Sequence, residues 1–266
     1  MNTLTQTDKM LSRKDGRVGY VIFNNPERRN AVSLEMWEAT ARILDDFKRD
    51  NDIRVVVLTG AGDKAFVSGA DISRFENERS SEEAIARYNE TVERANTAVY
   101  DYPKPTIAMI RGYCIGGGVG LALCCDLRIC SDDSRFGVPA ARLGLGYPFH
   151  GLKKLADVVG PSFAKEIFFT ARQFDAEEAR TMGLVNRVVP AAELPGYVKT
   201  YADTIGDNAP LTVATAKFTI GEVVKDESKR DLAKVAAMVK QCFDSKDYIE
   251  GRRAFMEKRK AVFTGT

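Results

Sequence analysis

Short runs rich in β-branched residues alternate with stretches of helical periodicity through the first two-thirds of the chain, and this alternation limits the fold most strongly. Strand character occupies five segments, residues 18–23, 54–60, 106–111, 127–130 and 185–189. Residues 34–49 follow Ser33, a typical helix N-cap, and place apolar side chains at helical spacing. Alternation of this kind favours an α/β fold with parallel strand pairing.

The strand signal ends near residue 192, and the remaining chain has helical periodicity. Four segments are predicted to be helices, residues 194–205, 210–224, 230–244 and 246–259. No Ser-, Gly- or Pro-rich linker separates the two parts of the sequence. We therefore predict an α/β core over residues 1–191 and a C-terminal helical region over residues 192–266.

Composition narrows the classes of function. The 266 residues carry 39 Lys and Arg against 37 Asp and Glu, a net charge of +2. This balance argues against a dedicated nucleic-acid binder. No run approaches the roughly 18 apolar residues of a membrane-spanning helix, and the first twenty residues lack the apolar region of a signal peptide. We expect a cytoplasmic protein that does not contact membranes.

Five cysteines and a single histidine limit the possible metal and nucleophile chemistry. Cys114, Cys124, Cys125 and Cys130 lie in apolar runs and lack the paired C-x2-C spacing of zinc sites. We expect these thiols to fill the core, and an odd total argues against a disulfide framework. With His150 as the one imidazole, no metal site is predicted.

Two glycine-bearing loops each follow a strand and lead toward a helix. The first is KAFVSGADI, residues 64–72, and the second contains three successive glycines, residues 116–118. Backbone N–H groups at a helix N-terminus lack intrahelical partners and carry partial positive charge. Two such loops can form an oxyanion hole, or their glycines can simply permit close packing of helix on strand. The spacing does not match the G-x-G-x-x-G of dinucleotide sites.

Three motifs, in this order, resemble the enoyl-CoA hydratase/isomerase (crotonase) superfamily: KAFVSGADI, KPTIAMIRGYCIGGGVGLALCCDLRICSDDSRFGVPAARLGL, and DYIEGRRAFMEKRKAVF. The similarity extends from about Gly19 to Thr266. It implies a spiral of ββα units followed by helices that build homotrimers, often paired into hexamers. It also implies an acyl-CoA substrate whose thioester oxygen is held in an oxyanion hole while an enolate forms, with no cofactor beyond the CoA moiety.

The resemblance assigns roles to individual residues. The N–H groups of Ala70 and Gly117 would be the two oxyanion donors. Near the C-terminus, Phe255, Lys258 and Lys260 match positions that often contact the nucleotide end of CoA, although a solvated basic helix over residues 252–260 fits equally. The residues that the resemblance implies in CoA binding are Arg28, Arg29, Ala31, Ser68, Gly69, Asp71, Ile72, Phe255 and Lys258.

Two positions depart from the hydratases of this superfamily. Those enzymes place one catalytic glutamate two residues after the glycine triplet, where this chain has Gly120. They place the second directly after F-G-x-P, where this chain has Ala140. Addition of water across a double bond needs a positioned acid/base, and neither residue exchanges a proton. The sequence therefore argues against hydration by two glutamates and against isomerisation by one.

Decarboxylation of a 2-carboxyacyl-CoA needs no base, because loss of CO2 generates the enolate directly and the oxyanion hole supplies most of the catalysis. Residues 143–171, together with residues 242–265, are similar to methylmalonyl-CoA decarboxylases of the superfamily, in which a tyrosine stands where this chain has Tyr147. We therefore predict a decarboxylase-like lyase in which the Tyr147 hydroxyl orients the departing carboxylate.

Two alternatives stay open. His150 lies three residues after Tyr147, and an imidazole there is able to protonate an enolate or act as a base near pH 7. It would then support hydration or isomerisation with non-standard residues, although a loop histidine without a role also fits. The second alternative is a non-catalytic acyl-CoA binder that kept the fold and lost the acid/base pair.

Overall fold

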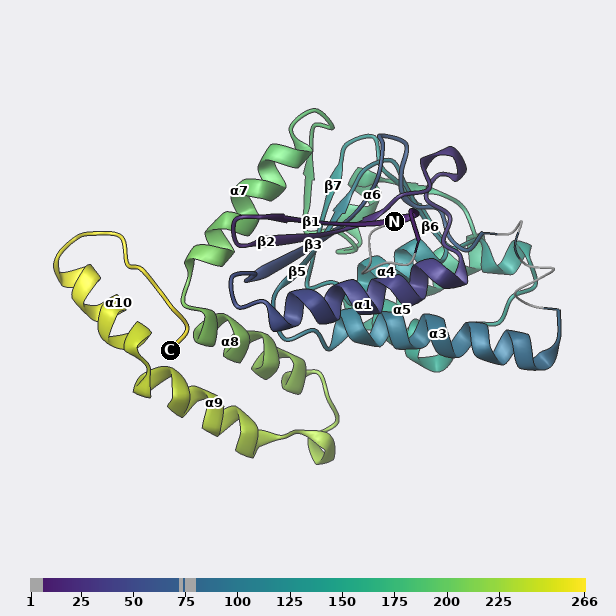
Figure 1. The fold of residues 1–266 in the computed structure, drawn as a ribbon. Helices are drawn as coiled ribbons and strands as arrows, with labels where there is room; N and C mark the ends of the chain where they lie inside the picture. The colour runs from purple at the N-terminus through teal and green to yellow at the C-terminus, as the bar shows by residue number, and fades with distance from the viewer. Residues whose placement is uncertain (1–6, 72–73, 75–79) are drawn as a thin grey trace.

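The computed structural model describes residues 7–71, 74 and 80–266, which form two β-sheets surrounded by helices (Figure 1). The larger sheet has the order β1-β2-β3-β5-β7-β10 and the smaller has the order β4-β6-β8-β9. The strands are β1 (Met10–Asp15), β2 (Val18–Phe23), β3 (Val55–Gly60), β4 (Ala65–Val67), β5 (Thr106–Ile110), β6 (Tyr113–Ile115), β7 (Leu127–Ser131), β8 (Arg135–Gly137), β9 (Phe174–Asp175) and β10 (Arg187–Val189).

Helices follow pairs of strands in a repeating unit. The successive units β3-β4-α3, β5-β6-α4 and β7-β8-α5 each place their first strand in the larger sheet and their second in the smaller sheet. The helices are α1 (Leu34–Arg49), α3 (Glu82–Tyr100), α4 (Gly117–Cys124), α5 (Phe149–Thr170), α6 (Ala176–Thr181), α7 (Leu194–Asp207), α8 (Pro210–Val223), α9 (Leu232–Asp244) and α10 (Lys246–Met256). The predicted α/β class and ββα spiral are confirmed.

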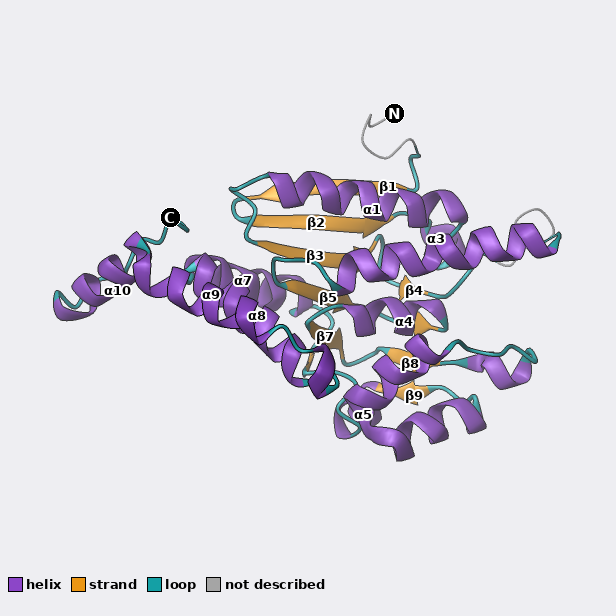
Figure 2. Ribbon diagram, turned by 90° about the horizontal axis from the view of Figure 1, so that it is seen from below, coloured by secondary structure: helices purple, strands orange, loops and turns teal. Residues whose placement is uncertain are grey.

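Both faces of the larger sheet are covered, which explains the apolar character of its strands. Val56 and Leu58 of β3 face the cluster that contains α1, whereas Val55 and Val57 face Leu194, Val198 and Ala202 of α7. This alternation is the period-two geometry of a strand. Helix α7 therefore belongs to the packed core although it follows residue 191, while α8, α9 and α10 extend away from the sheets (Figure 2).

The four clustered cysteines are buried and free, as predicted. Burial raises the pKa of the Cys114 thiol well above its usual range and raises that of Cys130 to about 12. Because a thiol reacts as its thiolate, we expect a native Cys242→Ser variant to take up no thiol reagent at neutral pH. The same variant unfolded in denaturant should take up four equivalents. Measurable labelling of the native variant would contradict this packing.

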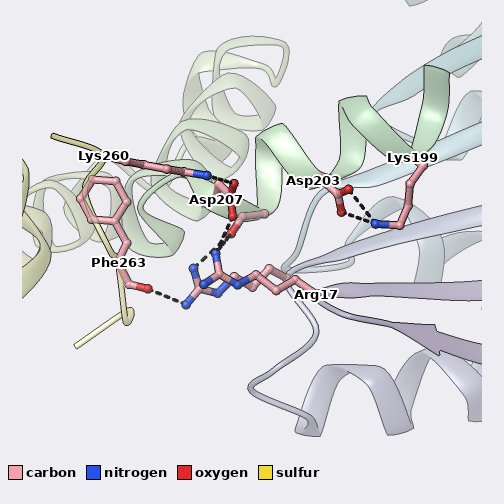
Figure 3. A network of polar contacts seen from close by, with 8 residues as sticks. Arg17, Lys199, Asp203, Asp207, Lys260 and Phe263 are labelled. Atoms are coloured by element: carbon pink, nitrogen blue, oxygen red, sulfur yellow. Dashed lines mark hydrogen bonds and ion pairs between the residues drawn. The ribbon is translucent and has the colours of Figure 1, made fainter. Parts of the chain in front are cut away.

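The chain end returns from α10 to the core. Arg54 Nη2 donates a hydrogen bond to the Phe263 carbonyl at 2.7 Å, and Asp207 accepts from both Arg17 (2.8 Å) and Lys260 (2.6 Å) (Figure 3). Helix α10 stops at Met256, short of the predicted residue 259, because Lys258 adopts a left-handed conformation with φ of 54°. The last residues are thus an ordered segment held by side chains of the core.

Candidate active site

The first glycine loop turns at the end of β4. Gly69 has φ of +105°, a conformation that favours glycine, and Ala70 follows it in an isolated parallel bridge with Val32. The Val32 N–H donates to the Gly69 carbonyl at 2.9 Å, and the Asp71 N–H donates to the Val32 carbonyl at 3.0 Å. These two bonds fix the backbone on both sides of Ala70 without using its N–H group.

The second loop leads from β6 into α4, with Gly116 as the N-cap and Gly117 as the first helical residue. The Gly116 N–H donates to the Gly137 carbonyl at 2.8 Å. A Cβ atom on Gly118 would lie 2.1 Å from the Val67 carbonyl oxygen, so only glycine permits α4 to approach β4 this closely. The close approach explains the glycine run: it brings the N-terminus of α4 against the first loop.

The two predicted donors lie beside one another. A Cβ atom built on Gly69 would lie 3.9 Å from the Gly117 nitrogen, and one built on Gly117 would lie 3.9 Å from the Gly69 Cα. Between residues that the structure describes, no hydrogen bond is donated by the Ala70 or Gly117 N–H group. Two adjacent unpaired N–H groups, one at a helix N-terminus, are suited to stabilise negative charge on an oxygen.

The segment of residues 27–31 forms a wall beside the first loop. The Ser68 N–H donates to the Arg29 carbonyl at 3.2 Å, and the Ser68 hydroxyl donates to the Arg28 carbonyl at 3.3 Å. The Arg28 guanidinium lies 3.6 Å from the buried Asp71 carboxylate. The structure therefore brings Arg28, Ser68, Gly69 and Asp71 together, with Ala31 buried at the base of the wall.

Arg29 faces a separate cavity of about 500 Å³. Its guanidinium lies 4.8 Å from the centre of the Tyr113 ring, a cation–π contact. The other lining residues are Asp63, Lys64, Gly112, Asp133 and Arg135. Lys64 and Arg135 were not predicted as site residues, although Lys64 is the first residue of the KAFVSGADI motif. Together with Arg29 they make this cavity cationic.

Asn30 is a structural residue that the sequence did not single out. It is fully buried with φ of 55°, and its Nδ2 donates to the Ala61 and Ala65 carbonyls at 3.0 and 2.7 Å. Its Oδ1 accepts from the Asn25 N–H at 2.9 Å. Asparagine tolerates the left-handed region better than most residues, which was the available signal. Asn30 thus joins the wall to β4.

Replacement of Asn30 by alanine should destabilise the protein strongly. The variant leaves three backbone groups without their partner and keeps a left-handed backbone that alanine disfavours, so we expect a loss of about 3 kcal/mol in the free energy of unfolding. Denaturant unfolding measures the difference. Asn24→Ala is the matched control, because Asn24 makes one exposed hydrogen bond to the Asp8 carbonyl, and a loss below about 1 kcal/mol is expected. Equal losses would contradict the assignment.

Gly120 and Ala140 leave the two glutamate positions without a titratable group. Gly120 lies one turn after Gly117 on α4, and a Cβ atom built on it would meet nothing within 4 Å. Ala140 is buried in the 3-10 helix Pro139–Arg142, with 3% of its surface exposed. The space beside Gly120 is therefore open to a larger side chain or to a substrate group.

Comparison with known proteins connects this geometry to a family. The family model described as Enoyl-CoA hydratase/isomerase matches residues 13–266. The chain belongs to the enoyl-CoA hydratase/isomerase family. It is 33% identical over 255 residues to a short-chain-enoyl-CoA hydratase of Clostridium acetobutylicum, with 96% of this chain and 97% of the relative covered. It is 34% identical over 260 residues to a crotonyl-CoA hydratase of Syntrophomonas wolfei, with 96% and 98% covered.

Solved structures of this family share the fold. An enoyl-CoA hydratase/carnithine racemase from Magnetospirillum magneticum superposes with a TM-score of 0.92 at 35% identity, covering 100% of this chain and 98% of that one. An enoyl-CoA hydratase from Bacillus anthracis superposes with a TM-score of 0.88 at 31% identity, covering 97% and 100%. The crotonase-like fold predicted from the three motifs is confirmed, and the chain is a member of a family of enzymes.

Tyr147 and His150, the two side chains predicted to act on the substrate of this family member, lie in different surroundings. The half-buried Tyr147 ring meets the Phe168 ring edge-on, with 4.9 Å between centroids. His150 is exposed in the first turn of α5, and its ring lies 5.8 Å from that of Phe149. Packing against Phe168 of α5 therefore restrains the tyrosine, whereas the ring that His150 meets, Phe149, is itself 72% exposed.

Phe255 and Lys258, two further predicted CoA contacts, are not brought to the oxyanion loops of the same chain. Helix α10, which carries Phe255, lies at the far end of the molecule from α4 and α5 in both views (Figures 1 and 2). Lys258 follows this helix directly. Both residues are exposed, Phe255 to 83%. Ile72, which was expected to line the CoA wall, lies outside the described residues.

Two further classes of feature are not found in the described part of this family member. No helix there is long and apolar enough to cross a bilayer. Nor do three His, Cys, Asp or Glu side chains converge there in a geometry that could hold a metal ion.

Proposed function

We propose that this family member binds an acyl-CoA and stabilises its thioester enolate through the N–H groups of Ala70 and Gly117. The observation that carries the proposal is the pair of unpartnered N–H groups where the two glycine loops meet. A thioester oxygen placed between them gains negative charge as the enolate forms, and two fixed donors stabilise that charge more than they stabilise the neutral carbonyl.

The proposed reaction is decarboxylation of a 2-carboxyacyl-CoA. The enolate electrons come from the broken bond to CO2, so no proton needs to be abstracted. Gly120 and Ala140 supply no acid/base, and this reaction is the one in the family's chemistry that needs none at the first step. Tyr147 is the group proposed to orient the departing carboxylate through its hydroxyl.

Hydration or isomerisation of an enoyl-CoA is the second candidate. It is favoured by the names of relatives that are about one-third identical over nearly the whole chain, such as the hydratases of C. acetobutylicum and S. wolfei. It needs a proton-exchanging group in place of the two glutamates. His150, exposed in the first turn of α5, is the proposed group.

The charged groups suggest how the CoA moiety is held. Arg28 beside Asp71 is proposed to contact a phosphate along the wall of the first loop. The cavity with Arg29, Lys64 and Arg135 offers further positive charge for the phosphates, and Tyr113 offers an aromatic surface. Guanidinium groups suit phosphate oxygens because they donate in a planar fork.

Self-association is proposed through α8, α9 and α10. These helices expose many large apolar side chains, including Ile220, Val223, Leu232, Phe243, Ile249 and Met256. A surface of this kind marks an interface, and the proposed assembly is the homotrimer, alone or paired. Phe255 and Lys258 would then contribute to CoA binding in the site of a neighbouring copy, since they lie far from their own chain's oxyanion loops.

Mass spectrometry of CoA thioesters after incubation with the purified protein tests the reaction. Methylmalonyl-CoA and crotonyl-CoA are offered together. Loss of the mass of CO2 from the first is expected. Gain of one water by crotonyl-CoA alone would overturn the lyase in favour of the hydratase, and His150→Ala would then show whether the imidazole is required. Binding of both without product would identify a non-catalytic acyl-CoA binder.

A further inference from the structure

The C-terminal end of α4 is surrounded by buried positive charge. Arg128 is 7% exposed, and its guanidinium donates to the Cys125 carbonyl from Nη1 and to the Leu184 carbonyl from Nε, both at 2.8 Å. Cys125 is the C-cap of α4. Across the described part of the chain, no carboxylate lies within ion-pair distance of this guanidinium. Burying a charge without a counter-ion costs free energy, so the buried position of Arg128 needs an explanation.

A second cation reaches the same end of α4 from the helical region. Lys217 of α8 donates to the Asp126 carboxylate at 2.8 Å and to the Lys104 carbonyl at 3.0 Å, and its side chain is 16% exposed. Asp126 directly follows the C-cap, and the same carboxylate oxygen accepts the Thr106 N–H at 2.7 Å and the Thr106 hydroxyl at 3.0 Å. Lys217 thus offsets the charge of Asp126 and joins α8 to the segment before β5 and to the residue that follows the C-cap of α4.

Positive charge at the carbonyl end of α4 changes the electrostatic potential at its N-terminus. The carbonyl end of a helix carries partial negative charge, which opposes the positive potential that its N-terminus offers to an anion. Arg128 and Lys217 together carry two positive charges against the single charge of Asp126. The pKa of the Arg128 guanidinium is lowered, mainly because the group is buried. The nearby Asp126 carboxylate acts in the opposite direction and offsets part of this shift. These three groups therefore leave one net positive charge at the carbonyl end of an eight-residue helix, and the Lys154 ammonium, which donates to the Cys124 sulfur there at 3.5 Å, adds to it.

We propose that Arg128 and Lys217 are positioning residues for the oxyanion hole: they anchor the carbonyl end of α4 and strengthen the positive potential at the Gly117 N–H. The inference rests on the proposed enolate chemistry. Helix α4 is about 12 Å long, so both groups act through the helix and neither touches the substrate. Because α8 belongs to the proposed interface, the anchor also couples assembly to the site.

The charge of Lys217 is expected to change the rate of the reaction. A unit charge about 15 Å from the oxyanion, in a medium of effective dielectric constant about 20, alters the rate about fivefold, equivalent to about 1 kcal/mol. We therefore expect Lys217→Gln to lower kcat about fivefold and to leave KM within about twofold. Lys217→Arg keeps the charge and should restore kcat.

A spectroscopic readout separates this role from a loss of stability. The probe is acetyl-CoA carrying 13C at the thioester carbonyl, bound to the intact protein. Its C=O stretching frequency should fall on binding to the wild type, fall less in Lys217→Gln, and recover in Lys217→Arg. Lys104→Gln is the matched control, because the Lys104 ammonium donates to the Phe47 and Asp50 carbonyls at the end of α1, whereas its contact with Lys217 is made by its backbone carbonyl, which the substitution keeps. It should leave the frequency at the wild-type value.

A second pair of variants, at Arg128, tests the same role if a variant at Lys217 fails to fold. Arg128→Lys keeps the buried charge, and Arg128→Met removes it; where both fold, only the second should reduce the carbonyl shift. An unshifted carbonyl in the wild type would overturn the oxyanion hole itself and the inference with it. A normal wild-type shift that Lys217→Gln retains, or that Lys104→Gln reduces equally, would overturn only the role of the anchor.

Discussion

Gly117→Pro should lower turnover of the acyl-CoA substrate by about 100- to 1000-fold. Gly117 is the first residue of α4, the helical position at which proline is tolerated best because its missing N–H is not needed by the helix. The substitution therefore removes one of the two proposed oxyanion donors while retaining a residue suited to start a helix. Steady-state kinetics on the substrate identified by mass spectrometry gives the change in kcat.

Gly117→Ala is the control for that variant. It keeps the N–H group, and its new Cβ atom would meet its nearest neighbours, Gly69 Cα and Trp37 Cζ2, at the ordinary contact distance of 3.9 Å. We expect kcat within about tenfold of the wild type, and circular dichroism should show that both variants are folded. If the folded proline variant turns over substrate as fast as the alanine variant, the Gly117 N–H is not an oxyanion donor.

Gly120→Glu should create hydration of crotonyl-CoA where the wild type has little. A Cβ atom at Gly120 would meet nothing within 4 Å, and the position lies one turn from the proposed donor Gly117. A positioned general acid/base contributes about 100- to 10,000-fold, so a gain of at least about 100-fold in hydration is expected. The same variant should lose decarboxylation, since the new carboxylate repels that of the substrate.

Gly120→Gln distinguishes the effect of proton exchange from the effect of side-chain size. Glutamine has nearly the shape of glutamate and cannot exchange a proton, so this variant should not hydrate crotonyl-CoA. Water addition is followed by loss of the absorbance of the enoyl thioester. Hydration by the wild type at the rate of Gly120→Glu would show that another group already acts as the acid/base, and the decarboxylase proposal would then be wrong.

Local sequence patterns predicted the longer helices and strands, because these segments contain enough residues to show a regular spacing of apolar side chains. The helix over residues 34–49 and the strand over residues 18–23 have the predicted bounds. The strands of the smaller sheet were not predicted, since β4, β6 and β8 have three residues each and too few positions to show alternation. Helix α7 was predicted, but its place on the sheet depends on packing with β3, which is distant in sequence.

For the candidate site, motif and spacing were sufficient to predict Ala70 and Gly117 as donors and to identify the two absent glutamates. They were not sufficient to separate Arg28 from Arg29, two adjacent residues of one type. The left-handed backbone at Arg29 directs its side chain to the Tyr113 cavity, whereas Arg28 remains beside Asp71. Asn30, Lys64 and Arg135 acquire their positions from contacts between distant segments, so the neighbouring sequence carries little signal for them.

Reading along the chain was enough to establish which chemical groups are present: two glycine loops able to expose N–H groups, and glycine and alanine where glutamates would exchange protons. How these groups come together depends on the three-dimensional packing. Gly118 lets α4 pack against β4, which places two unpaired N–H groups side by side, and α8 places Lys217 near Arg128 at the other end of α4. These arrangements depend on long-range packing, because each joins groups that lie far apart along the chain.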